Sequence, residues 1–254
     1  MAEVNRLEVS NISKWFGGVH AVSDVSFSAR DGVIKAIIGP NGAGKTTLIN
    51  LLTGFLQVDS GSIHFNDRPI NGLRPHKIVS LGISRTFQTV DVFEGMTVLE
   101  NVMLGSYSLS STSAFSHAFL FPGARKEEKN LRARAVEFLH FVGLDEIANM
   151  EANSTSYGDQ KKIVLARALT SNPKLLFLDE PVAGLNETET EKIADILREI
   201  KKQGVGIILV EHDMRLVMGI ADEILVVNFG TKLCEGAPEE VRNNAEVIKA
   251  YLGT

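Results

Sequence analysis

Residues 39–47 read Gly39-Pro40-Asn41-Gly42-Ala43-Gly44-Lys45-Thr46-Thr47, and they follow directly after the apolar run Val33–Ile38. The stretch matches the phosphate-binding pattern G-x-x-x-x-G-K-[ST] at every fixed position. Glycines let the backbone curl around phosphate oxygens because no Cβ stands in the way, and the inward N–H groups bind the anion. In such a loop Lys45 reaches the β- and γ-phosphates, and the Thr46 hydroxyl holds Mg²⁺.

The alternative is a plain glycine-rich turn between a strand and a helix. Against it, strand, loop and an apolar helix containing Leu48, Leu51 and Leu52 arrive in the required order. The sequence therefore predicts a protein that binds a nucleoside triphosphate together with magnesium.

Composition narrows the class of protein. The chain has 254 residues, 44% of them hydrophobic, which is enough for a well-buried core in one or two domains. The 26 Lys and Arg residues against 31 Asp and Glu give a net charge of −5, which does not favour a nucleic-acid partner. The single cysteine, Cys234, excludes an internal disulfide and fits a reducing compartment. It lies in the alternating run Thr231–Glu235 and is interpreted as a packed strand residue.

Neither a signal peptide nor a membrane span is expected. Residues Met1–Leu7 lack a basic region followed by an apolar stretch. No apolar run approaches the roughly 20 residues needed to cross a bilayer. We expect a soluble protein that could work at a membrane through a partner.

The predicted strands are of two kinds. Partly alternating apolar residues predict half-buried antiparallel strands over Leu7–Phe16 and Val19–Ala29, with a turn at Gly17-Gly18 and a short strand at Gly61–Phe65. Continuous apolar runs, typical of strands buried on both faces, occur at Val33–Ile38, Lys174–Leu178, Val205–Val210 and Glu223–Asn228. A further short strand is predicted at Ile83–Phe87. Helices alternate with the buried strands, which indicates a parallel α/β sheet.

The segment from about Asp91 to Leu169 lacks strand-type alternation and is interpreted as a helical insertion. One apolar helix face within it is formed by Leu131, Ala135, Phe138, Leu139 and Val142, with Gly143 as the stop. An irregular connection is expected over Gly105–Gly123. Asn186 and Glu189 predict a capping box for a later helix. The stretch Pro238–Leu252 predicts an amphipathic helix pair or extension.

Two acids, Asp179 and Glu180, end the apolar run Leu175–Leu178. An acid at the carboxyl end of a buried strand can face the phosphate loop, where such folds bind ligands. Asp179 then suits Mg²⁺, directly or through water, and Glu180 can polarise a water toward the γ-phosphate. The alternative is a solvated pair that begins a turn before Pro181. The phosphate loop upstream favours the first interpretation.

The stretch before this strand carries a family resemblance. Thr155-Ser156-Tyr157-Gly158-Asp159-Gln160, followed by Ala166-Arg167-Ala168-Leu169, resembles the signature segment of ATP-binding-cassette (ABC) ATPases, usually Leu-Ser-Gly-Gly-Gln. Thr155, Tyr157 and Asp159 depart from that form. Ser156 and Gly158 remain, as a phosphate-contacting helix start requires. Asp159 places a negative charge where a γ-phosphate should lie, unless it points away.

The resemblance implies further site residues. Phe16 stands where the family stacks an aromatic on adenine, with Trp15 as its rival and a core aromatic as the alternative for both. Gln88 matches the glutamine that contacts Mg²⁺ or the attacking water. His212, at the end of the strand Val205–Glu211, matches the switch histidine of the γ-phosphate, although a surface histidine is the alternative. Ala183-Gly184-Leu185-Asn186 resembles the loop that touches a partner ATPase subunit.

The predicted site can be stated in full. Catalytic roles fall to Glu180, His212, Gln88 and Lys45. ATP is held by residues 39–47 with Phe16, Ser156 and Gly158, and the metal by Thr46, Gln88 and Asp179. The fold class is an α/β P-loop NTPase of the ABC type, with a mixed sheet core, an antiparallel β-subdomain and a helical insertion. An ABC ATPase domain is expected over residues 6–238, with a nucleotide-binding core of about 6–88 and 170–238 and a helical subdomain of about 89–169. Residues 239–254 form a C-terminal helical extension.

Several stretches narrow the resemblance to the branched-chain amino acid importers, and to the larger of their two ATPase subunits. They are Trp15-Phe16-Gly17-Gly18, Ser84 to Gln88, Met96 to Val102, Glu211-His212-Asp213-Met214, and the ending Arg242-Asn243-Asn244 through Ala250-Tyr251-Leu252-Gly253. Importers of urea, short amides or aromatic compounds share these features, so the sequence does not identify the transported solute.

The resemblance also implies partners and a place of work. Two ATPase subunits, identical or paralogous, would pack head to tail around two ATP molecules. Integral permease subunits would hold the chain at the cytoplasmic face of the plasma membrane and work with a solute-binding protein outside. A groove by Gln88 would receive a short permease helix, with Phe87, Phe93 and Met96 as candidate contacts or, alternatively, ordinary packing residues.

Three rival functions remain at this point. The first is a non-transport ABC ATPase acting in DNA repair or on ribosomes, but this acidic single cassette has no basic surface, second cassette or coiled coil. The second is the ATPase of an exporter, for example one that extracts lipopolysaccharide. The third is a nucleotide-binding module without turnover.

Overall fold

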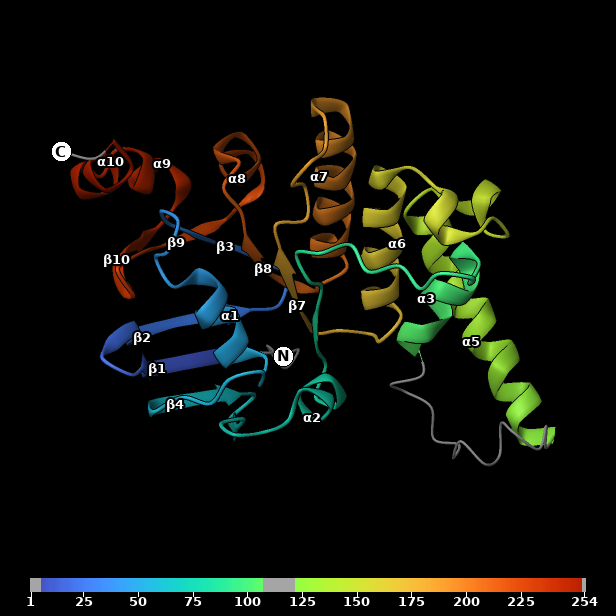
Figure 1. Ribbon diagram of the computed structural model, residues 1–254, viewed down its shortest axis with the longest axis horizontal. Coiled ribbons are helices and arrows are strands. Elements are labelled where there is room, and N and C mark those ends of the chain that lie inside the picture. Colours follow the sequence, from blue (N-terminus) through green and yellow to red (C-terminus); the bar gives the residue numbers. More distant parts are fainter. Residues whose placement is uncertain (1–5, 107–121, 253–254) are drawn as a thin grey trace.

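The computed structural model describes residues 6–106 and 122–252, which form two β-sheets and the helices around them (Figure 1). The four-stranded sheet has the order β2-β1-β4-β5, and the six-stranded sheet has the order β10-β9-β3-β8-β7-β6. The mixed larger sheet, the antiparallel smaller sheet and the separate helical group agree with the predicted fold class.

The strands of the larger sheet are β3 (Ile34–Ile38), β6 (Ile83–Arg85), β7 (Leu175–Asp179), β8 (Gly206–Val210), β9 (Glu223–Asn228) and β10 (Thr231–Gly236). All neighbouring pairs are parallel except β10 with β9, which are antiparallel. Every residue of β3, β7 and β8 is buried. Sheets of parallel strands need cover on both faces, which explains the continuous apolar runs in the sequence.

The strands of the smaller sheet are β1 (Arg6–Phe16), β2 (Val19–Arg30), β4 (Ser60–Phe65) and β5 (Arg68–Pro69). All of its pairs are antiparallel. In β2 buried residues partly alternate with more exposed ones, as expected for a sheet with one covered face. Leu7 and Val9 of β1, on the covered face of this sheet, belong to the same core cluster as Phe177 of β7, so the two sheets pack together.

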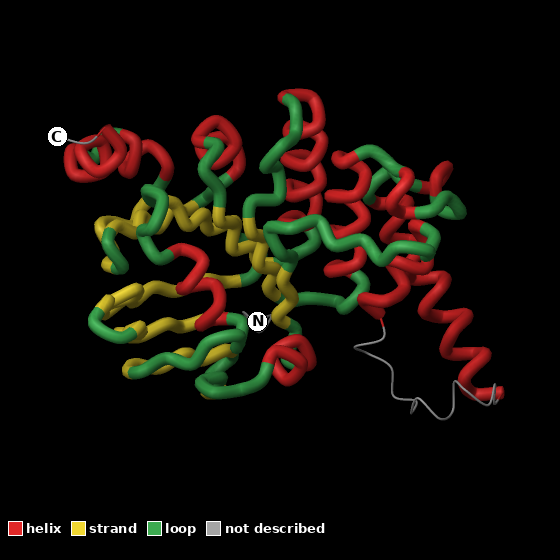
Figure 2. Tube along the Cα trace, viewed as in Figure 1, coloured by secondary structure: helices red, strands yellow, loops and turns green. Residues whose placement is uncertain are grey.

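The helices are α1 (Lys45–Leu52), α2 (Pro75–Ser80), α3 (Val98–Ser106), α5 (Pro122–Phe141), α6 (Tyr157–Leu169), α7 (Glu187–Lys202), α8 (Met214–Ile220), α9 (Pro238–Arg242) and α10 (Ala245–Leu252), with short 3₁₀ turns η2 (Asp145–Ile147) and η3 (Ala152–Ser154). In Figure 1, α1 lies between the two sheets, and α7, α8 and α10 lie above the larger sheet. Figure 2 shows α3, α5 and α6 grouped to one side of the strands.

Alternation along β7 explains how one strand serves two cores. Leu175 and Phe177 point into the core shared with α1 and the smaller sheet. Leu176 and Leu178 point to the other face, into the core shared with α6, α7 and α8. Because successive side chains of a strand point to opposite faces, this five-residue strand is held firmly on both sides. Its carboxyl end is therefore a rigid support for the residues that follow.

Most predicted elements are confirmed, and the differences are local. The strand expected at Ile83–Phe87 ends at Arg85, and the strand expected to run to Glu211 ends at Val210. Neither β5 nor α2 was expected, because each is short and lies in a polar stretch. The capping box of α7 is confirmed, with both hydrogen bonds between Asn186 and Glu189 present. Most of the expected irregular connection, residues 107–121, lies outside the described residues.

Candidate functional site

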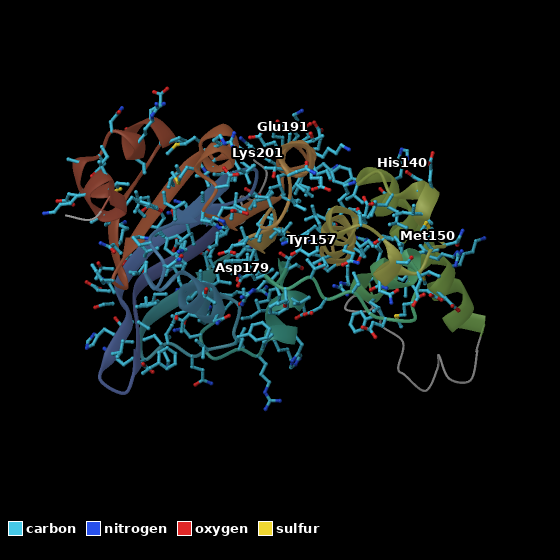
Figure 3. All side chains as sticks on the ribbon, turned by 45° about the horizontal axis from the view of Figure 1, so that its top comes forward. His140, Met150, Tyr157, Asp179, Glu191 and Lys201 are labelled. Atoms are coloured by element: carbon cyan, nitrogen blue, oxygen red, sulfur yellow. The ribbon has the colours of Figure 1, made fainter. Side chains whose placement is uncertain are left out.

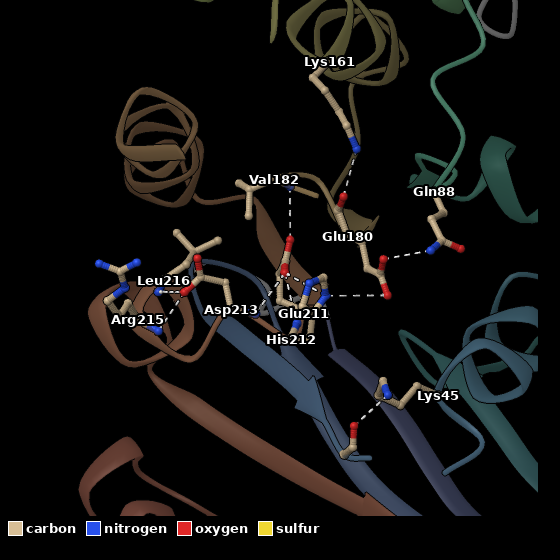
Figure 4. A network of polar contacts seen from close by, with 11 residues as sticks. Lys45, Gln88, Lys161, Glu180, Val182, Glu211, His212, Asp213, Arg215 and Leu216 are labelled. Atoms are coloured by element: carbon tan, nitrogen blue, oxygen red, sulfur yellow. Dashed lines mark hydrogen bonds and ion pairs between the residues drawn. The ribbon is translucent and has the colours of Figure 1, made fainter. Parts of the chain in front are cut away.

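The predicted catalytic residues meet at one edge of the larger sheet. Strands β3, β8 and β7 are neighbours and run parallel, so their carboxyl ends lie at the same edge. The phosphate-binding loop follows β3, Glu180 follows β7 and His212 follows β8 by two residues. Figure 4 shows Lys45, Gln88, Glu180 and His212 around this edge. The fold thus gathers side chains that lie far apart in the sequence.

The loop between β3 and α1 depends on two glycines. A Cβ on Gly39 would lie 2.1 Å from the backbone oxygen of Val227, which real structures do not allow. Gly44 has a φ of +99° and would place a Cβ 2.3 Å from the oxygen of Ala21. A residue without a Cβ adopts such a backbone without strain. The glycines therefore let β2 and β9 approach the loop closely.

Lys45 begins α1 and folds back over the loop. Its Nζ donates hydrogen bonds to the carbonyl oxygens of Gly39 at 2.7 Å and Pro40 at 3.0 Å. Burial lowers the pKa of Lys45, while the nearby carboxylates of Glu180 and Asp179 act in the opposite direction. The ammonium is thus held inside the loop, where a phosphate could replace the carbonyls. Thr46 follows it as an exposed residue of the first helical turn.

Glu180 occupies an unusual backbone conformation. Its φ of +49° is uncommon for a residue other than glycine, and such conformations cost of order 1–3 kcal/mol. Gln88 Nε2 donates a hydrogen bond of 2.8 Å to Glu180 Oε2, and His212 Nδ1 lies 3.8 Å from Glu180 Oε1 (Figure 4). The Glu180 side chain is 23% exposed. A carboxylate hydrogen-bonded at one oxygen and still open to water can act as a general base.

Asp179 has a partner that the sequence did not reveal. Its Oδ2 lies 3.1 Å from Nη2 of Arg85, and both side chains are almost fully buried. Burial raises the pKa of Asp179, and Arg85 limits the rise. Arg85 also donates to Asn50 and Thr53 of α1 and its C-cap through Nη1. One arginine thus connects β6, β7 and α1 beneath the site.

We expect Arg85→Met to lower the free energy of unfolding by about 3–5 kcal/mol, because it leaves the Asp179 charge buried without its partner. Chemical denaturation of the full chain measures the loss. Arg198→Met is the matched control, since that guanidinium pairs with Glu191 and Asp195 at 37% exposure and should cost less than about 1 kcal/mol. The double variant Arg85→Met/Asp179→Asn should recover much of the loss, and strict additivity of the two substitutions would contradict the pairing.

Ser156 and Asp159 form the start of α6. Ser156 is the N-cap and accepts a hydrogen bond from the Asp159 N–H, while its hydroxyl donates to Asp159 Oδ2 at 2.7 Å. Asp159 Oδ1 lies 2.9 Å from Nζ of Lys162. The negative charge that the sequence placed near a γ-phosphate is therefore partly neutralised. Ser156 remains exposed at this helix end.

The same helix start packs on the loop before α7. A Cβ on Gly158 would lie 2.9 Å from Oε1 of Glu189, and a Cβ on Gly184 would lie 3.1 Å from the ring of Tyr157. Figure 3 shows Tyr157 near the centre of the molecule, toward Asp179. Among the described residues, Ser156 makes its side-chain bonds to Asp159, and Lys45 makes its bonds to Gly39 and Pro40, so no hydrogen bond joins Ser156 to Lys45.

The two aromatic candidates for adenine differ in their surroundings. Trp15 Nε1 donates a hydrogen bond of 2.8 Å to His20, and the two rings meet edge to face. Phe16 is 47% exposed at the end of β1, with Lys14 Nζ 5.7 Å from its ring centre. The more open face therefore belongs to Phe16. Neither is a core aromatic.

A groove of about 440 Å³ separates the sheet edge from the helical group, and it is lined in part by Phe87, Phe93, Arg167 and Ala168. Arg85 also lines it. Arg85 stacks on Phe87, and Arg167 lies over Phe93 and donates to the carbonyl oxygen of Asp91. Phe87 is 45% exposed and Phe93 52% exposed. The third candidate contact, Met96, does not line this groove.

Sequence reasoning missed three further residues beside the site. Glu211 is buried and accepts hydrogen bonds from the N–H groups of Val182, His212 and Asp213, so it joins the turns after β7 and β8. Burial raises the pKa of Glu211. Lys161 of α6 bonds the backbone of Glu180. Tyr251 of α10 lies beside the backbone of Gly39, and burial raises its pKa to about 12.

The donor set suits a magnesium ion bound mainly by phosphate and water. Within residues 6–106 and 122–252 no three His, Cys, Asp or Glu side chains form a ready metal cluster. Mg²⁺ usually takes one or two protein ligands and completes its shell from phosphates and water. The buried Asp179 carboxylate, the exposed Thr46 hydroxyl and the exposed Gln88 amide are oxygen donors of this kind.

Among the described residues, no helix has the length and apolar character required to cross a membrane.

Comparison with known proteins agrees with this geometry. The family model described as "ABC transporter" matches residues 22–183, and that described as "Branched-chain amino acid ATP-binding cassette transporter" matches residues 231–254. The high-affinity branched-chain amino acid transport ATP-binding protein LivG of Salmonella typhimurium is 44% identical over 248 residues, covering 97% of both chains. The corresponding protein BraF of Pseudomonas aeruginosa is 42% identical with the same coverage.

Solved structures give the same result. A nucleotide-free ATP-binding cassette from an ABC transporter superimposes with a TM-score of 0.86 at 34% identity, covering 98% of this chain and 100% of that one. An ABC transporter cassette in its ADP conformation gives a TM-score of 0.86 at 34% identity, covering 98% and 99%.

Proposed function

The chain belongs to the ATP-binding subunits of ABC transporters, and from this premise we propose that it hydrolyses ATP to drive an importer of branched-chain amino acids. The observation that carries the proposal is the meeting of Lys45, Asp179, Glu180 and His212 at one sheet edge. The solute class rests on the match of residues 231–254 and on the names of the similar proteins.

In the proposed reaction the loop of residues 39–47 holds the phosphates of ATP, and Phe16 stacks on adenine. Lys45 leaves the carbonyls of Gly39 and Pro40 and contacts the β- and γ-phosphates. Thr46, Gln88 and Asp179 would hold Mg²⁺. When bound, the ion neutralises charge on the phosphate oxygens.

Glu180 is the proposed general base. It orients a water for attack on the γ-phosphate and accepts its proton, while Gln88 fixes one carboxylate oxygen. His212 lies on the other side of the carboxylate and would contact the γ-phosphate. The helix start at the exposed Ser156 and the adjacent, buried Gly158 would complete the site of a second ATPase subunit, identical or paralogous, in a head-to-tail dimer. This arrangement gives a use to a helix start that makes no hydrogen bond to the phosphate loop of its own chain.

We further propose that the groove by Phe87 and Phe93 receives a short helix of a permease subunit, which keeps the chain at the cytoplasmic face of the plasma membrane. Half-exposed aromatic rings are common anchors in protein interfaces. Residues 89–169 would then move as a helical subdomain against a core of residues 6–88 and 170–238, with 239–254 as an extension. A periplasmic or extracellular binding protein would supply the solute.

Co-purification in mild detergent tests the proposal. The full chain, expressed with its neighbouring genes, should bring down permease subunits. Reconstituted in proteoliposomes with its binding protein, the complex should hydrolyse ATP faster when leucine, isoleucine or valine is added. Stimulation only by urea, amides or aromatic acids would overturn the solute class. Release of a lipid into the medium, or no membrane subunit at all, would overturn import.

A further inference from the structure

Lys161 is a buried cation for which the proposed reaction has no use. It lies in the second turn of α6 and is 7% exposed. Its Nζ donates a hydrogen bond of 2.9 Å to the backbone carbonyl of Glu180 (Figure 4). Burial lowers the pKa of Lys161, and the carboxylates of Glu211, Glu180 and Asp179 act in the opposite direction. A lysine is rarely placed this deeply without a specific partner.

The bond reaches the one residue of the site whose backbone needs support. Glu180 has a φ of +49°, and such a conformation persists only where its surroundings hold it. Its N–H donates to the carbonyl of Val210 at 2.9 Å, which fixes the residue to β8. Its carbonyl accepts from Ala183 N–H at 3.2 Å and from Lys161. The bond from Lys161 thus joins this peptide to a second element, helix α6, in addition to β8.

The same ammonium group also lies near the helix start proposed to face the second subunit. The ring of Tyr157, next to Ser156, lies 5.6 Å from the Lys161 Nζ, within the range of a cation–π contact. The same ring packs beside Gly184, in the loop that follows Glu180. Tyr157 replaces the first glycine of the usual signature segment, so this contact belongs to a side chain that the usual form lacks. A displacement of the start of α6 would therefore move Nζ relative to the Glu180 carbonyl.

We propose that Lys161 is a positioning residue for Glu180, which couples the start of α6 to the orientation of the carboxylate in the same subunit. The inference rests on the proposed function, because it assigns Glu180 the role of general base. The contacts of Lys161 are to the Glu180 carbonyl and the Tyr157 ring. Lys161 fixes the peptide from which the base projects, and a nucleotide bound at Ser156 of the same chain would act on hydrolysis through this bond.

Lys161→Met tests the inference, because methionine has a similar length and no donor. We expect kcat for ATP to fall on the order of 10–100-fold, as misplacement of a catalytic group by about 1 Å does. KM for ATP, the affinity for MgATP and the melting temperature should stay near parental values. Lys161→Arg keeps a donor and a positive charge and should restore most of the lost kcat. Lys202→Met is the matched control, since that ammonium pairs with Glu199 at 68% exposure and should leave kcat unchanged.

Three outcomes would overturn the inference. The first is a parental kcat in Lys161→Met, and the second is no recovery of kcat in Lys161→Arg. The third is a loss of kcat in Lys161→Met that is accompanied by losses of ATP affinity and melting temperature large enough to explain it. Glu180→Gln, assayed beside them, separates this inference from the proposed function. If Glu180→Gln hydrolyses ATP at the parental rate, the assigned base is wrong. If Glu180→Gln is inactive and Lys161→Met is not, the general base stands and only the positioning role fails.

Discussion

Glu180→Gln is expected to lower the rate of ATP hydrolysis on the order of 10²–10⁴-fold, the usual contribution of a general base. Glutamine has the same shape and cannot accept the proton of the attacking water. It adds no bulk, so the left-handed backbone at this position and the bond from Lys161 to its carbonyl should persist. The side chain loses one charge, which faces His212 and the Gln88 amide. Single-turnover release of phosphate by the purified full chain measures the loss.

Binding of ATP should survive in the same variant. Neither carboxylate oxygen of Glu180 bonds the phosphate loop, and removing a negative charge near the phosphates favours an anion. Equilibrium titration with a fluorescent ATP analogue should give a parental or lower Kd. Glu187→Gln is the control, because that carboxylate is 81% exposed and pairs with Arg215 on the surface. Parental phosphate release in Glu180→Gln would exclude the proposed base, and a general loss of ATP binding would indicate a structural role.

The buried sheet was predictable because its chemistry is local. A strand covered on both faces is apolar along most of its length. The runs Val33–Ile38, interrupted only by Lys35, and Val205–Val210 therefore carry the same signal. Short polar elements give no such signal. Strand β5 has two exposed residues, and α2 has six residues with one buried isoleucine, Ile78. Tertiary contacts define these elements, and periodicity cannot show them.

The residues of the candidate site also divide into those that the sequence reveals and those that it does not. The phosphate loop and the Asp179-Glu180 pair are visible in sequence because the backbone or the strand end requires those residue types in that order. Arg85 and Lys161 are not visible, because the decisive partner of each, Asp179 or Glu180, lies many positions away in the sequence. A lysine in a polar helix start and an arginine in a short strand are ordinary in sequence. They become informative only when burial and a partner are known.

Two details show what the geometry adds. Asp159 is an unfavourable charge in the sequence, but in the structure it bonds Ser156 and Lys162, so the departure from the usual signature has local compensation. The sequence shows Glu180 only as an acid at the end of a buried strand. The structure adds its positive φ and the hydrogen bonds that join its backbone to β8 and α6. Both features lie where a subunit would have to respond to the nucleotide of its partner.

Lys45→Met is expected to weaken MgATP binding on the order of 10–100-fold, since a hydrogen bond to a charged group is worth about 1.5–3 kcal/mol. Hydrolysis by the loaded protein should fall as well, because charge that develops on the transferred phosphoryl group loses a fixed cation. Titration with a fluorescent ATP analogue measures the first effect, and phosphate release at saturating ATP measures the second.

The contacts of Lys45 with the loop make a second variant necessary, because the cation and the conformation of the loop must be tested separately. Its Nζ holds the carbonyls of Gly39 and Pro40, so Lys45→Met could loosen the loop as well as remove the cation. Lys45→Arg retains the charge but carries a planar group too large for the same position. If a compact ammonium at that point decides affinity, both variants bind MgATP poorly while their melting temperatures stay near the parental value. A parental Kd in Lys45→Met would remove Lys45 from the phosphate site, and with it the interpretation of residues 39–47 from which the fold and the function were derived.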